Sequence, residues 1–253
     1  MSFLNKLGIG VGVGAGAGRG LSRSVPSDSR PRTAGPAPSA AVGATRAPDL
    51  RESTRVSNGL KEFLWNLDGL GRGALLDLGP AWQTTLSFFI ERGFRVSSED
   101  ILREWKEFLV EEETRLRAAA GNPSQELDVT PAGRAARFLE NNLRYPAATF
   151  DAVLLWDLLD YFEPVVAKQV VTSLTELLRP AGVVFAMFHS KKPEGFQRYR
   201  VVDSNSLQVV STPPLCPAQR VYQNREIQDL FLRYRTMKSF IGRDQLRESL
   251  FIK

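Results

Sequence analysis

The chain has 253 residues, 43% of them hydrophobic, which suffices for one large or two small domains with a core. A single cysteine, Cys216, excludes a disulfide framework, and a single histidine, His189, excludes multi-histidine metal chemistry. No apolar run reaches the roughly 18 residues of a membrane-spanning helix. We therefore expect no membrane span and a reducing compartment, the cytoplasm.

The net charge of +5 is confined to residues 1–58, which carry eight Lys and Arg against three Asp and Glu. The other residues hold equal numbers of basic and acidic side chains. The sequence thus gives no strong signal for nucleic-acid binding.

Residues 1–58 are rich in Gly, Ala, Ser, Pro and Arg, with few large apolar residues after Leu21. Such a segment cannot offset its ordering entropy by burial, so we predict a disordered basic tail. A signal peptide, with Lys6 before a glycine-rich apolar stretch, and a basic organellar presequence stay open as alternatives. One domain is expected over residues 59–253.

The first half of that domain alternates between helical periodicity and short apolar runs. Thr130 and Pro131 are typical of a helix N-cap and first helical position. Residues 137–142 fit either the end of that helix or a short third strand. The predicted elements are a helix from about residue 56, a strand at 74–78, a helix at 84–92 stopped by Gly93, a strand at 94–97 and a long helix at 99–120.

The second half contains a continuous apolar run, residues 150–156, which is typical of a central parallel strand covered on both faces. Arg-Pro-Ala-Gly at 179–182 is expected to end the helix that precedes it. The predicted elements are a helix at 164–178, a buried strand at 183–188, strands at 199–202 and 207–210, a helix at 224–234 and strands at 238–241 and 249–253.

The stretch from Gly73 to Asp100 reads as strand, glycine turn, helix, strand and acid. This is the pattern of a nucleotide-binding half of a doubly wound sheet. Glu99 follows Gly79 by 20 residues, the spacing at which a ribose-binding acid is found.

The motifs LDLG, FDAVLLWDLLDYF and LLRPAG, within about residues 70–190, resemble the class I S-adenosylmethionine (SAM)-dependent methyltransferases. The resemblance implies an α/β fold with a doubly wound, mostly parallel sheet and an antiparallel C-terminal strand pair. It also implies SAM as cofactor and methyl transfer as activity.

The resemblance also implies positions for the cofactor. Asp77 and Gly79 match the acid and first glycine that contact its methionine end, and Ala81 and Gln83 stand where two further glycines are usual. Whether the turn has room for a ligand depends on where Trp82 and Gln83 point.

The remaining candidate cofactor contacts follow the next strands. Glu99 or Asp100 would accept hydrogen bonds from ribose hydroxyls, or would simply complement the dipole of a helix capped by Ser98. Asn142, beside Asn141, matches an adenine-binding position or an ordinary turn. The other two candidates are Trp156, which stacks on adenine or belongs to the core, and Asp157, which faces the pocket.

We predict methyl transfer from SAM to an acceptor that is either a small molecule or a macromolecule. His189, at the end of a buried strand, is the candidate catalytic base or else a structural residue. Two other readings stay open: a cofactor-free methyltransferase-like binding or scaffold module, and a nicotinamide-dependent oxidoreductase. The latter fits less well because the turn lacks G-x-G-x-x-G.

Overall fold

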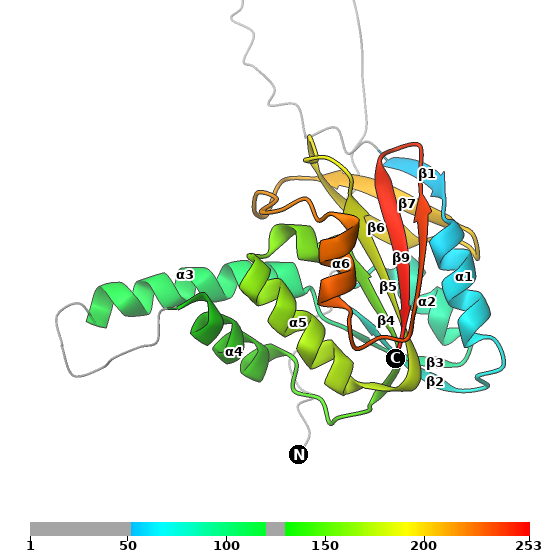
Figure 1. The fold of residues 1–253 in the computed structure, drawn as a ribbon, viewed down its shortest axis with the longest axis horizontal. Helices are drawn as coiled ribbons and strands as arrows, with labels where there is room; N and C mark the ends of the chain where they lie inside the picture. The colour runs from blue at the N-terminus through cyan, green and yellow to red at the C-terminus, as the bar shows by residue number, and fades with distance from the viewer. Residues whose placement is uncertain (1–51, 120–129) are drawn as a thin grey trace, which may run out of the picture. The chain divides into compact units, whose positions relative to one another are not determined.

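The computed structural model describes residues 52–119 and 130–253, and its centre is a six-stranded sheet in the order β3-β2-β4-β5-β9-β8 (Figure 1). Four strands run parallel, whereas β9 is antiparallel to both β5 and β8. The strands are β2 (Gly73–Asp77), β3 (Phe94–Ser98), β4 (Phe150–Trp156), β5 (Leu178–His189), β8 (Thr236–Ile241) and β9 (Leu246–Ile252).

A second sheet of three antiparallel strands has the order β1-β7-β6, with β1 at Glu52–Val56, β6 at Phe196–Val201 and β7 at Ser206–Thr212. Residues 52–58, which the sequence assigns to the tail, form β1, the N-cap and the first residue of α1. The rest of the expected tail, residues 1–51, lies outside the described residues, as do residues 120–129.

Helices cover both faces of the central sheet, as a buried parallel sheet requires. In Figure 1, α4, α5 and α6 lie on the near face, and α3 extends away from the sheet. One apolar core lies between the sheet and α3 to α6, and the other between the sheet, α1, α2 and β6–β7. The helices are α1 (Asn58–Leu67), α2 (Gln83–Ile90), α3 (Ile101–Ala119), α4 (Pro131–Asn142), a 3₁₀ turn η1 (Leu158–Tyr161), α5 (Pro164–Leu177) and α6 (Asn224–Leu230).

Local signals explain where several elements begin and end. The Ser57 hydroxyl accepts a 2.9 Å hydrogen bond from the Leu60 amide and caps α1. Thr130 caps α4 with Pro131 in its first turn, as predicted. Gly93 has φ +86°, a left-handed conformation that glycine adopts without strain, and it turns the chain from α2 into β3.

The structure decides one open alternative and moves the start of one predicted strand. Residues 137–142 form the end of α4 and not a third strand. The helix before residues 179–182 ends at Leu177, as predicted, but these residues belong to the start of β5, where Ala181 takes φ +63° and the pairing with β4 shifts register. The Pro-Ala-Gly sequence lies in a bulge of β5, between the residues that pair with Phe150 and Ala152 of β4.

Candidate functional site

The sheet brings the sequence-predicted residues to one edge. Strands β2, β3, β4 and β5 are parallel and end at Asp77, Ser98, Trp156 and His189, respectively. Ligands of open α/β sheets bind beyond these carboxyl ends. The candidate site is therefore the group of side chains at this edge.

Asp77 is the most buried carboxylate of the turn after β2, with 1% of its surface exposed. Its Oδ1 accepts hydrogen bonds from the Gly79 amide at 3.0 Å and from the indole Nε1 of Trp156 at 2.7 Å. Its Oδ2 is buried and has no hydrogen-bond partner among the described residues. Burial raises the pKa of Asp77 to about 6, although the bonds from Trp156 and Gly79 act in the opposite direction.

The indole of Trp156 fills the space beside Gly79. A Cβ added to Gly79 would lie 2.7 Å from the Trp156 Nε1, closer than real Cβ atoms approach a neighbour. The ring is stacked on Tyr199 at 6.0 Å between centroids and meets Phe185 edge-on. Glycine at position 79 is thus required by the protein's own tryptophan.

Trp156 also has an unusual backbone, with φ +54°. Such a left-handed conformation costs a non-glycine residue about 1–2 kcal/mol and persists only where the surroundings impose it. Here the conformation directs the indole back toward Asp77 at the end of the neighbouring strand.

The bulky residues of the turn itself point elsewhere. Gln83 is exposed, and its amide donates a 3.0 Å hydrogen bond to the Ser87 hydroxyl. Trp82 is half-buried and lies under the guanidinium of Arg200, 5.3 Å from its ring centroid. Ala81 is exposed. The room beside Gly79 is therefore taken by Trp156 from β4, which sequence reasoning did not foresee.

The two acids after β3 have protein partners. Glu99 accepts a short hydrogen bond from the Tyr145 hydroxyl, and Asp100 forms a 2.9 Å ion pair with Arg198 of β6. The Ser98 hydroxyl donates to the Gly79 carbonyl at 3.3 Å, which ties the ends of β2 and β3 together. Neither Tyr145 nor Arg198 was marked by the sequence pattern.

The asparagines at the end of α4 bond locally. Asn142 donates to the Phe138 carbonyl at 2.8 Å, and Asn141 accepts from Arg144 at 2.7 Å. None of their described hydrogen bonds reaches the carboxyl edge of the sheet, so an adenine contact of Asn142 stays a prediction.

A second group of ionisable side chains lies beside Trp156. The His189 Nδ1 lies 2.9 Å from Oδ2 of Asp160, which also accepts the His189 backbone amide at 2.7 Å. The other ring nitrogen, Nε2, is 3.9 Å from Oδ2 of Asp157, and the Tyr199 hydroxyl donates to that same oxygen at 3.3 Å.

Burial dominates the acidity of this group. It raises the pKa of Asp157 to about 7, against the opposing charge of His189. Burial alone would lower the pKa of His189, but the bond to Asp160 and the charge of Asp157 outweigh it, and the net pKa lies above its ordinary value. An imidazole held by one carboxyl and facing a second can exchange protons near neutral pH.

No group of three His, Cys, Asp or Glu within residues 52–119 and 130–253 could hold a metal ion. Cys216 is half-buried, and burial raises the pKa of its thiol. None of the helices in these ranges combines the length and apolar character that crossing a bilayer requires.

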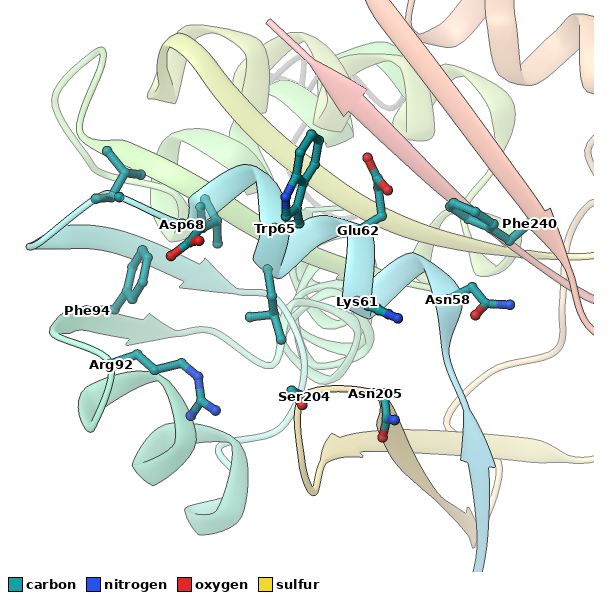
Figure 2. A pocket seen from close by; sticks show the side chains of 14 residues that line it. Asn58, Lys61, Glu62, Trp65, Asp68, Arg92, Phe94, Ser204, Asn205 and Phe240 are labelled. Atoms are coloured by element: carbon teal, nitrogen blue, oxygen red, sulfur yellow. The ribbon is translucent and has the colours of Figure 1, made fainter.

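An open groove of about 960 Å³ lies away from this edge, along α1 and the start of β3 (Figure 2). Trp65, Lys61 and Glu62 of α1 line it together with Arg92 and Phe94. None of the residues predicted from sequence lines this groove, so the carboxyl edge remains the candidate site.

Comparison with solved structures gives distant similarities. A protein from Pyrococcus horikoshii is 19% identical, with 76% of this chain and 86% of that one covered and a TM-score of 0.41. The 1,6-didemethyltoxoflavin-N1-methyltransferase of Burkholderia thailandensis, solved with 1,6-didemethyltoxoflavin and S-adenosylhomocysteine, is 16% identical over 78% of this chain and 79% of its own, with a TM-score of 0.40. A SAM-dependent methyltransferase from Methanosarcina mazei is 13% identical over 72% and 93%, respectively, with a TM-score of 0.38.

No protein-family model matches the sequence, and no curated protein is similar to it in sequence. The strand order and the antiparallel C-terminal pair carry the assignment of the fold. The described residues form an α/β fold with a mostly parallel sheet and an antiparallel C-terminal strand pair, the arrangement that the resemblance to the class I SAM-dependent methyltransferases predicted.

Proposed function

We propose that the chain transfers a methyl group from SAM to a nucleophilic acceptor. The observation that carries this proposal is Oδ2 of Asp77, a buried carboxylate oxygen without a hydrogen-bond partner among the described residues. Such an oxygen is costly unless a donor reaches it. It belongs to the turn at which the resemblance puts the amino-acid end of the cofactor.

The hydrogen-bond acceptors at this edge suit the cofactor, but the space beside Gly79 is occupied. Asp77 offers an acceptor for an ammonium group, and Glu99 and Asp100 offer acceptors for ribose hydroxyls at the end of β3. The indole of Trp156 occupies the space beside Gly79, however. Loading therefore requires the indole to leave Asp77 and Tyr199, and we expect β6, which carries Tyr199, to move with it.

When bound, the cofactor would supply an activated methyl group, so the protein needs only to hold the acceptor in line and take its proton. His189 is the residue proposed for the proton, because Asp160 fixes its Nδ1 and leaves Nε2 open. Asp157 and Tyr199 lie beside Nε2 and belong to the same hydrogen-bonded group.

A second function, that of a cofactor-free binding module, is favoured by the same turn. Trp156 satisfies Asp77 Oδ1, Tyr145 satisfies Glu99 and Arg198 neutralises Asp100. Each of these carboxylates already has one internal partner, and Oδ2 of Asp77 is the atom that this alternative leaves unsatisfied.

Calorimetric titration of the full chain with SAM, S-adenosylhomocysteine and NAD separates these functions. Saturable binding of the first two, without NAD, is the result expected for a methyltransferase. If none of the three binds at millimolar concentration, the transferase proposal is overturned and the cofactor-free module stands. Binding of NAD alone would support the oxidoreductase.

A further inference from the structure

Two small cavities meet at His189, beyond the end of β5. One, of about 260 Å³, is lined by Arg55, Tyr199 and Leu246, and the other, of about 240 Å³, by Lys191 and the rest of the loop that follows β5. His189, Gln197 and Asp244 line both cavities. Together they have the size of a small-molecule site rather than of a macromolecular groove.

The ring of His189 is fixed with one nitrogen free. Asp160, which is fully buried, holds both the ring Nδ1 and the backbone amide of His189 through one oxygen. Nε2 has no hydrogen bond among the described residues, and its nearest acidic atom, Asp157 Oδ2, is 3.9 Å away. The His189 side chain, which is 11% exposed, thus carries a polar atom without a hydrogen bond in the wall of the cavities.

The side chains that line the two cavities carry one more cation than acid, with Arg55, Lys191 and Lys192 against Glu194 and Asp244, while the buried Asp157 lies behind Nε2 of His189. Asp244 is paired with Arg55 at 3.0 Å, and Asp160 faces both His189 and Arg247. Lys191 and Lys192 are exposed at the cavity wall, and no described residue forms an ion pair with them. Glu194 is the one acid of this wall that no described cation pairs with. This imbalance favours an anionic ligand group.

We propose that the two cavities form one binding site for a small molecule carrying an oxyanion, with the Nε2–H of the protonated His189 ring as its buried donor and Lys191 and Lys192 at its entrance. Tyr199 lines this site and is stacked on Trp156, which in turn lies against Gly79. The two rings thus stand between the site and the turn after β2. Identifying this molecule as the methyl acceptor would rest on the proposed function, whereas the binding site itself does not.

His189 is the only histidine of the chain, so its ring protons give one unambiguous NMR signal for the site. The test titrates the full chain with inorganic phosphate and with acetate, at fixed pH, with chloride keeping the ionic strength constant. A saturable shift of the His189 Hε1 signal is expected with at least one of the two anions.

Matched variants give the test its controls. Lys191→Ala with Lys192→Ala should weaken binding about threefold or more, since two favourable charges are removed. Lys61→Ala with Lys168→Ala removes the same charge from exposed positions on α1 and α5 and should leave binding unchanged. Equal affinities in the two double variants would overturn the site. So would a His189 shift that does not saturate and is the same when chloride replaces phosphate or acetate.

Asp160→Asn tests the positioning role separately. It removes the charge bonded to Nδ1, so the pKa read from the same Hε1 signal should fall. An unchanged pKa in a variant that still melts cooperatively would contradict that role. Because these measurements need no SAM, binding of phosphate without binding of SAM would keep the site and reject the methyltransferase, and the reverse result would do the opposite.

Discussion

The indole Nε1 of Trp156 donates a 2.7 Å hydrogen bond to Oδ1 of Asp77 and connects the carboxyl ends of β4 and β2. The same oxygen accepts the amide of Gly79, so three residues of the candidate site share one acceptor. A side chain from within the fold thus satisfies the carboxylate at which the cofactor's amino-acid end is proposed to bind. Whether the chain loads SAM depends on how readily this indole leaves.

Replacing Trp156 with leucine should strengthen S-adenosylhomocysteine binding at least tenfold, about 1.4 kcal/mol. The smaller side chain clears the space beside Gly79 and frees Asp77 Oδ1. The large-to-small change in the core should also lower the free energy of unfolding by several kcal/mol. Calorimetry and urea unfolding measure the two effects.

Trp65→Leu is the matched control, because this tryptophan of α1 is 68% exposed and lies in the groove of Figure 2. It should change neither affinity nor stability appreciably. Equal affinity of wild type and the Trp156 variant would mean that the indole is no barrier to the ligand.

Gly79→Ala should lower the free energy of unfolding by about 1–3 kcal/mol, because its methyl group would overlap the Trp156 ring. Gly71→Ala, where a Cβ would meet nothing within 4 Å, should cost less than about 0.5 kcal/mol. The cost at Gly79 should shrink in the Trp156→Leu background. A double-mutant cycle of urea unfolding measures this coupling, and an additive result would refute the contact.

Much of the fold could be predicted from the sequence because its signals are local. A continuous apolar run such as residues 150–156 is typical of a strand that is buried on both faces. Gly93 indicates the end of a helix, because glycine adopts a left-handed conformation without strain. Thr130 with Pro131 fixes the start of α4 in the same way. The chain order of these elements then restricts the sheet to few arrangements.

The candidate site could be predicted only in part, because its decisive contacts join distant elements. The convergence of Asp77, Trp156 and His189 follows from parallel strands ending at one edge. The pairing of Asp100 with Arg198 spans 98 positions and leaves no local mark in β6, where Arg198 is one of three polar residues. The direction of the Trp156 ring depends on its left-handed backbone, which no propensity predicts for tryptophan.

The stability of the chain should fall as pH rises from 5 to 8. Asp77 and Asp157 have folded-state pKa values of about 6 and about 7, above the ordinary value of 3.8, so the folded state holds protons that the unfolded chain releases. Stability is therefore lost as pH rises toward each folded pKa, at up to about 1.4 kcal/mol per pH unit and group. His189 acts in the same direction, since its pKa is also raised on folding.

Urea unfolding at four pH values measures this slope. Asp157→Asn should flatten it between pH 5 and 7, since an amide keeps an acceptor for Tyr199 and does not titrate. Asp203→Asn, an exposed change in the turn between β6 and β7, should leave it unaltered. A wild-type stability that rises over this range would contradict the assigned acidities.

Arg198→Ala should loosen β6 over the candidate site. The Arg198 side chain is 11% exposed and pairs with the side chain of Asp100, which is 24% exposed, so its loss should lower stability by about 1–3 kcal/mol, more than for an exposed pair. Because β6 carries Tyr199, which holds Trp156 by stacking, the amides of residues 196–201 should exchange faster and S-adenosylhomocysteine should associate faster. Arg200, on the same strand as Arg198, forms a more exposed pair with Glu52 of β1, so Arg200→Ala should have the smaller effect on both rates. If the two variants exchange and bind alike, the Arg198–Asp100 pair does not hold the strand over the site.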